Sequence, residues 1–94
     1  MAVEKLSDDE IANRLEHLEG WTREGDTIQR SLEFDGFEEA IAFINRIAEH
    51  AERADHHPEI FNVYNGVDLT LTTHDADGLT YKDFDLAEKI NGEV

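Results

Sequence analysis

Residues 60–73, with the sequence IFNVYNGVDLTLTT, hold two runs of strand-forming residues on either side of Asn65-Gly66. Asn-Gly between such runs is the strongest short-range signal of a β-hairpin, because both central residues of a type I′ turn need positive φ. We therefore predict strands over 60–64 and 67–73. Apolar and polar residues alternate along the second strand, which predicts one buried and one exposed face.

A second pair of strands is predicted earlier in the chain, over 21–23 and 27–34, around a turn at 24–26. Alternate residues of the longer strand are apolar except Arg30, which falls where a core residue is expected. Because both pairs are joined by tight turns, each should form an antiparallel ladder.

The first and last helices are marked by capping boxes. One begins with Ser7 and Glu10 and stops at Gly20, and the other begins with Thr80 and has Asp83 at the matching position.

The longest helix should have Asp35 as its N-cap and run to about Ala54, since Pro58 disfavours helix at the residue before it. Its expected apolar stripe consists of Phe37, Ala40, Ile41, Ile44, Ile47, Ala48 and Ala51.

The resulting order, α-β-β-α-β-β-α, predicts an α+β fold. It should be a two-layer sandwich, with helices on one face of a four-stranded antiparallel sheet. No linker, repeat or low-complexity tract interrupts the sequence, so residues 1–94 are expected to form a single domain.

The chain carries 23 Asp and Glu against 8 Lys and Arg, a net charge of −15. Without a basic patch to neutralise phosphates, direct binding of nucleic acid is not expected. Acidity on this scale destabilises a compact domain unless salt screens the repulsion, which favours a halophilic protein. An acidic protein adapted to ordinary salt is the alternative.

No run approaches the roughly 18 apolar residues of a membrane span, and residues 1–5 lack the pattern of a signal peptide. We therefore expect a cytoplasmic protein that does not associate with membranes. The absence of cysteine excludes a disulfide and a thiolate metal site.

Three of the five histidines, His56, His57 and His74, fall at the ends of the second hairpin. Antiparallel pairing brings those ends together. Side chains that titrate near neutral pH are thereby predicted to form an acid/base site for a small polar ligand. Glu52, four residues before His56, should hydrogen-bond that imidazole if the helix continues. Further polar groups that could hold a ligand are Asp55, Thr72 and Thr73.

Other polar residues have simpler interpretations. His17 and His50 lie on helices without a polar cluster and are interpreted as surface or structural residues. Asp83 can complete a capping box or belong to the site, and Tyr64 can pack or touch a ligand. Zinc would accept three histidines and a carboxylate, but the usual chelating spacings are missing, so no metal is expected.

Several of these residues stand at a distinctive spacing: Glu52, the run His56-His57-Pro58, Tyr64 six residues after the proline, His74 ten later and Asp83 nine further on. This spacing resembles the signature of the pterin-4a-carbinolamine dehydratases. The stretches 55–65 and 71–75 are similar to the most characteristic parts of that family. The predicted order of elements fits as well, so the resemblance covers nearly the whole chain.

The resemblance implies an enzyme, a hydro-lyase that dehydrates 4a-hydroxytetrahydrobiopterin-type pterins to quinonoid dihydropterin, in pterin recycling or a related pterin pathway. It implies no metal or organic cofactor, and a homodimer or homotetramer. His56, His57 and His74 would be catalytic. The substrate-binding residues it implies are Glu52, Asp55, Thr72, Thr73 and Asp83.

One position departs from the family. Tryptophan is usual two residues after the proline, where this chain has Ile60. The loss of an aromatic surface near the pterin keeps an alternative open, a non-catalytic pterin-binding or protein-binding module.

Overall fold

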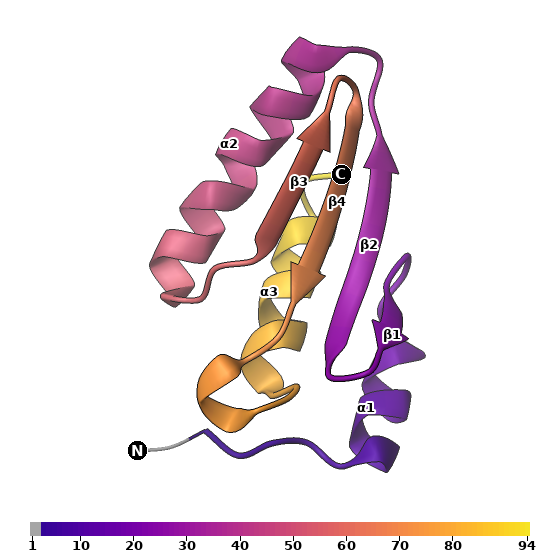
Figure 1. Cartoon of the computed structure of the whole chain (residues 1–94), viewed down its shortest axis with the longest axis vertical. Coiled ribbons are helices and arrows are strands. Elements are labelled where there is room, and N and C mark those ends of the chain that lie inside the picture. The colour runs from indigo at the N-terminus through magenta and orange to yellow at the C-terminus, as the bar shows by residue number, and fades with distance from the viewer. Residues whose placement is uncertain (1–2) are drawn as a thin grey trace.

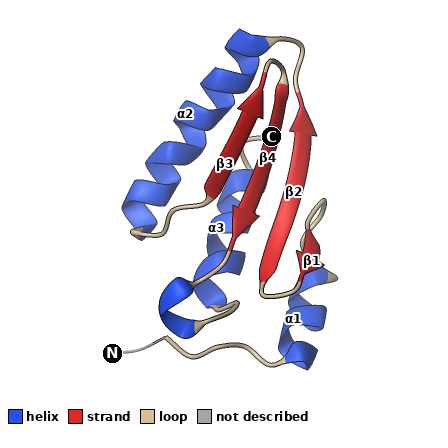
Figure 2. Cartoon of the chain, in the orientation of Figure 1, coloured by secondary structure: helices blue, strands red, loops and turns tan. Residues whose placement is uncertain are grey.

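A computed structural model describes residues 3–94. Met1 and Ala2, which belong to the segment 1–5 predicted not to be a signal peptide, lie outside the described residues. The elements, shown in Figures 1 and 2, are α1 (Asp8–Leu15), β1 (Thr22–Glu24), β2 (Thr27–Glu33), α2 (Phe37–Ala54), β3 (Glu59–Val63), β4 (Gly66–Leu71), the 3₁₀ turn η1 (His74–Ala76) and α3 (Tyr81–Asn91). The predicted order of helices and strands is confirmed, and both predicted capping boxes form.

The four strands form one antiparallel sheet in the order β1-β2-β4-β3. Because α2 connects β2 to β3, the second hairpin begins at the far edge of the sheet and returns β4 to its centre. Ile28 of β2 pairs with Leu71 of β4, and Leu32 pairs with Val67, so apolar residues of both strands share one face.

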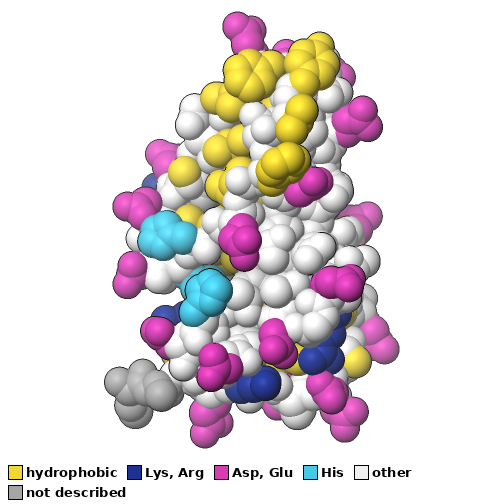
Figure 3. All heavy atoms as spheres, in the orientation of Figure 1, with side chains coloured by type: hydrophobic (Ala, Val, Ile, Leu, Met, Phe, Trp, Pro, Cys, Tyr) yellow, Lys and Arg dark blue, Asp and Glu magenta, His cyan; other side chains and the backbone are white. Residues whose placement is uncertain are grey.

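The helices cover that apolar face, as predicted. Figure 1 shows α3 behind the sheet and α2 along its β3 side. All three helices and the central strands contribute residues to the core. Its buried residues are Ile11, Leu18, Trp21, Ile28, Ala40, Phe43, Ile47, Ala51, Val67, Leu69, Leu71, Leu79, Phe84, Leu86, Ala87 and Ile90. The opposite face is open and largely polar at its centre (Figure 3). No helix within residues 3–94 is long and apolar enough to cross a membrane.

The N-terminus of α2 differs from the prediction. Gly36 is the N-cap and no side chain caps the helix, so the assignment of Asp35 is wrong. The apolar stripe is also rotated. Phe43, absent from the predicted stripe, is fully buried and lies with its ring centroid 4.9 Å from that of Phe34, whereas Phe37 is 51% exposed.

The turn of the second hairpin is shifted by one residue. Val63 pairs with Gly66, so the loop is Tyr64-Asn65 and the predicted Asn65-Gly66 centre is wrong. The cause is a non-local contact. Asn65 accepts from the Phe34 amide at 2.9 Å and donates its side-chain Nδ2 to the Phe34 carbonyl at 2.9 Å. Tyr64 therefore takes the positive φ, of 50°.

Arg30 occupies its core-facing position without being left unpaired. Its guanidinium donates to the Asn91 Oδ1 at 2.5 Å and to the Glu19 carbonyl at 3.1 Å. The indole N–H of Trp21 donates to the same Asn91 oxygen at 2.8 Å. These contacts join β2 to the end of α3 and explain the break in alternation.

Candidate active site

The end of α2 sets the direction of the first two histidines. Asp55 follows the helix with a left-handed φ of 49°, and this turn carries His56 and His57 away from the helix. Because the helix does not continue, Glu52 does not reach His56, and the predicted contact between them is wrong. Glu52 Oε2 instead lies 2.5 Å from Nε2 of His57, at the exposed rim.

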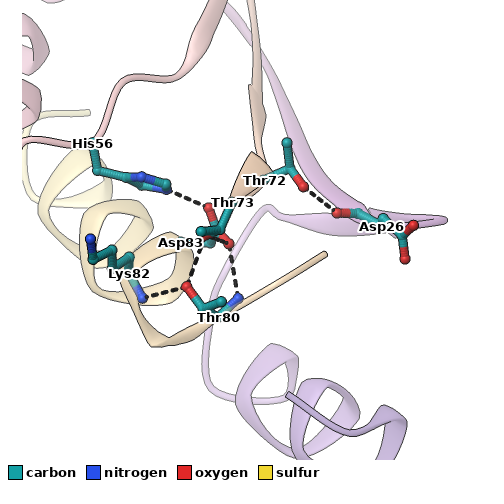
Figure 4. Close-up of polar contacts among 7 residues, drawn as sticks. All are labelled: Asp26, His56, Thr72, Thr73, Thr80, Lys82 and Asp83. Carbon is teal, nitrogen blue, oxygen red and sulfur yellow. Dashed lines mark hydrogen bonds and ion pairs between the residues drawn. The ribbon is translucent and has the colours of Figure 1, made fainter. Parts of the chain in front are cut away.

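His56 is held from the opposite side, by α3. Its Nε2 lies 2.6 Å from Oδ1 of Asp83, and the Asp83 side chain is completely buried (Figure 4). Both residues are thus fixed by an interaction between segments that are distant in the chain. Burial strengthens such a bond, because water does not compete for either partner.

Both carboxylate oxygens of Asp83 are engaged within the protein. Its Oδ2 accepts from the Thr73 hydroxyl at 2.8 Å and from the Thr80 amide at 3.0 Å. The two threonine hydroxyls are 2.8 Å apart. Since Thr73 donates to the carboxylate, Thr80 donates to Thr73, and the chain of bonds is complete. Asp83 therefore lies behind His56, where it caps α3 and orients the imidazole.

These carboxylates define the tautomers of both histidines. An ionised carboxylate only accepts hydrogen bonds, so Nε2 of His56 and Nε2 of His57 carry the protons. In each neutral ring, Nδ1 is then the nitrogen that can accept a proton.

His74 comes from a different segment. β4 ends at Leu71, earlier than predicted, and His74 is the first residue of η1. Thr73 and Gly78 close the loop by two backbone hydrogen bonds, of 3.1 and 3.3 Å. The closed loop holds the exposed His74 at the rim of the site.

The three histidines line one cavity of about 260 Å³. Its remaining lining residues are Asp55, Thr72, Thr73, Asp75 and Lys82. Thr72 is fixed by donating its hydroxyl to the Asp26 carbonyl at 2.7 Å (Figure 4). The hairpin and the end of α2 thus bring together the groups that were predicted to converge.

Two predicted binding residues stand back from this cavity. Glu52 and Asp83 each contact a histidine from outside, and neither lines the cavity. Tyr64 and Ile60 are also absent from its lining. Lys82, two residues after the helix cap Thr80, also lines the cavity and was not predicted from the sequence.

A larger cavity, of about 370 Å³, lies between α1 and α3 and contains a single histidine, His17. His17 Nδ1 is engaged with the Asn13 carbonyl at 3.1 Å. Within residues 3–94, no group of three or more histidine or acidic side chains is arranged to hold a metal ion. The 260 Å³ cavity is therefore the one where proton-transfer groups gather.

The fold and the site define a small α+β protein with a histidine-lined pocket at the edge of its sheet. The sequence model described as "Pterin 4 alpha carbinolamine dehydratase" matches residues 4–92. This chain belongs to the pterin-4a-carbinolamine dehydratase family.

Individual relatives agree over nearly their full length. The chain is 52% identical over 92 residues to a Burkholderia orbicola protein named "Putative pterin-4-alpha-carbinolamine dehydratase", covering 96% of this chain and 90% of the relative. A protein of the same name from Nostoc sp. is 55% identical over 86 residues, 92% of each chain.

Solved structures extend the similarity. A Brucella melitensis protein described as a transcriptional coactivator/pterin dehydratase superposes with a TM-score of 0.93 at 40% identity, over 96% of this chain and 98% of that one. A pterin dehydratase-like protein described as a RuBisCO assembly factor in the alpha-carboxysome has a TM-score of 0.69 at 20% identity, over 82% of this chain and 92% of that one. The latter shows the shared fold alone.

Proposed function

We propose that this chain catalyses the dehydration of 4a-hydroxytetrahydropterins to quinonoid dihydropterins in the cytoplasm. The observation that carries the proposal is the convergence of His56, His57 and His74 on one cavity. Membership of the dehydratase family supports the same reaction.

The reaction needs two proton transfers, which suit imidazoles. The bond between C4a and the hydroxyl oxygen breaks, and the departing oxygen takes a proton to leave as water. The N5–H bond loses its proton, and its electron pair forms the double bond between N5 and C4a. Imidazoles titrate close to neutral pH, so they can give the first proton and take the second.

In this proposal His57 and His74 flank the reacting centre, and His56 shares the proton transfers. Glu52 and Asp83 act as positioning residues, because each hydrogen-bonds one histidine from outside the cavity. Asp55, Thr72 and Thr73 line the cavity and hold the pterin.

The proposal is tested by kinetics of three histidine variants. His57→Ala and His74→Ala should each lower kcat on the order of 10²-fold, as removal of a general acid or base does. His17→Ala is the matched control, because His17 lines a different cavity. Wild-type rates in both cavity variants would contradict the assigned roles.

We further propose that the chain forms a homodimer or homotetramer through strand β3. This strand lies at the edge of the sheet, and its apolar residues Phe61 and Val63 are 63% and 61% exposed. Figure 3 shows apolar side chains gathered over this end of the molecule. An open edge offers unpaired backbone groups to another strand, which a second copy can satisfy.

Light scattering on the purified chain tests this assembly. Val63→Lys should lower the measured mass to that of a monomer, because a buried charge at the edge opposes pairing. Val94→Lys changes a similarly exposed valine at the C-terminus and serves as the control. A monomeric wild type would contradict the proposal.

A further inference from the structure

A second cavity adjoins the histidine pocket. It has a volume of about 300 Å³ and lies between the end of α2 and α3. Its lining residues are Ala54, Tyr81, Lys82, Asp85, Glu88 and Lys89. Lys82 lines both cavities, and Figure 4 shows it on α3 next to His56. We call the second cavity the α2–α3 groove.

The groove is rich in lysine for so acidic a chain. The chain has three lysines, and two of them, Lys82 and Lys89, line the groove. Asp85 stands three residues after one and four before the other, a spacing that permits ion pairs. Yet neither lysine forms an ion pair within residues 3–94. Both ammonium groups are available to a ligand.

We propose that the α2–α3 groove binds the side chain of the pterin substrate, and that Lys82 and Lys89 select a side chain carrying a phosphate monoester. This inference rests on the proposed function, which seats the pterin ring among the histidines. In this arrangement the substituent on the ring extends out of the pocket past Lys82, which lines both cavities. The shared wall at Lys82 offers an exit into the groove.

The charge of the ligand follows from the two ammonium groups. A phosphate monoester carries a charge of about −1.5 to −2 at neutral pH, which matches two lysines better than a single carboxylate does. Asp85 and Glu88 balance the lysines, so the groove as a whole has no net charge. Attraction therefore depends on direct contact with the ammonium groups, and the neighbouring carboxylates oppose it.

Equilibrium binding measured by pterin fluorescence tests the proposal. The probes are a dihydropterin with a phosphate monoester on its side chain and the same compound without the phosphate, at constant ionic strength. The phosphate form should bind the wild-type chain more tightly. Lys89→Gln should reduce that preference about tenfold, as loss of a charge-assisted hydrogen bond does. Asp85→Asn should increase it.

Arg53→Gln is the matched control. It removes one positive charge from the last turn of α2 without altering a groove residue, so the preference should stay at its wild-type value. Equal affinity for both probes, or equal losses in Lys89→Gln and Arg53→Gln, would overturn the inference.

Measurement of turnover distinguishes failure of the groove assignment from failure of the proposed function. Dehydration of the phosphate-free 4a-hydroxytetrahydropterin without a preference that depends on Lys89 would overturn the groove assignment alone. Selective binding of the phosphate form without turnover of either compound would support the groove and contradict the dehydratase assignment.

Discussion

Asp83 contributes both to the stability of the protein and to the geometry of its site. One oxygen accepts from the amide of Thr80, which caps α3, and the other contacts His56. A side chain that serves both purposes ties the imidazole to the first turn of a helix. The position of His56 therefore depends on the packing of α3.

Asp83→Asn should lower both activity and stability. The amide presents a donor where the carboxylate accepts, so one buried partner loses its hydrogen bond, at a cost of about 2 kcal/mol. We expect a fall in kcat and in the free energy of unfolding measured with denaturant. Asp68→Asn, at an exposed position on the open face of the sheet, should change neither. An Asp83→Asn variant with wild-type stability and kcat would contradict the dual role.

At the scale of residues, the sequence predicted which residues belong to the candidate site better than it predicted their hydrogen-bond partners. The three histidines were found because antiparallel pairing fixes where strand ends meet. The partner of Glu52 was predicted wrongly, because the left-handed turn at Asp55 has no clear signal in the sequence. Lys82 was missed because a single lysine gives no pattern.

At the scale of elements, the loop between α1 and β1 depends on Gly20. Its φ is +85°, and a Cβ there would come within 2.6 Å of the Arg30 guanidinium carbon. Gly25, in the β1–β2 turn, also has positive φ, of +60°, but a Cβ there would meet nothing within 4 Å. Both positions have a backbone conformation that would strain a residue with a Cβ, and they differ in how much room that Cβ would have.

Gly20→Ala should therefore cost more stability than Gly25→Ala. Backbone strain alone predicts a loss of about 1 kcal/mol at Gly25. At Gly20, displacement of Arg30 from its partners Asn91 and Glu19 should raise the loss to about 2 kcal/mol or more. Denaturant unfolding of both variants measures the difference. Equal losses would show that Arg30 moves aside at no cost.

Secondary-structure elements were predicted correctly where the sequence signal is local. Both capping boxes formed as expected, because each needs only a few neighbouring residues. The hairpin register was shifted because Asn65 bonds to Phe34, which lies far away in the chain. The alternation of β2 was broken at Arg30 for the same reason, since its partners come from other elements.

At the scale of the whole molecule, the C-terminal segment is fastened to α2. Glu93 lies 2.7 Å from Nε2 of His50 and 3.3 Å from Nε of Arg46. The hydrogen bond from His50, followed by the charges of His50 and Arg46, lowers the pKa of Glu93 from its ordinary value of 4.5.

Because this pKa is lowered by folding, the carboxylate stabilises the protein above about pH 4.5 and less as pH falls through the folded value. Glu93→Gln should thus lower the free energy of unfolding at about pH 6, and the difference from wild type should shrink towards about pH 3. Glu49→Gln removes an exposed carboxylate from α2 and is the control. A difference that does not depend on pH would contradict the role of Glu93.

The net charge of −15 predicts a dependence on salt. Screening over a Debye length of about 3 Å at 1 M salt should relieve repulsion among surface carboxylates, so Tm should rise steeply as KCl is added. Sucrose stabilises proteins by exclusion from their surface and does not screen charge, so Tm should rise less steeply with sucrose than with KCl. Full stability without salt would contradict the proposed halophilic character.

The dehydratase assignment is tested most directly by the rate at which the purified chain dehydrates a 4a-hydroxytetrahydropterin in several molar KCl. The histidine-lined cavity predicts acceleration well above the spontaneous reaction, and a loss on the order of 10²-fold in His57→Ala under the same conditions. A folded chain that leaves the spontaneous rate unchanged would contradict it.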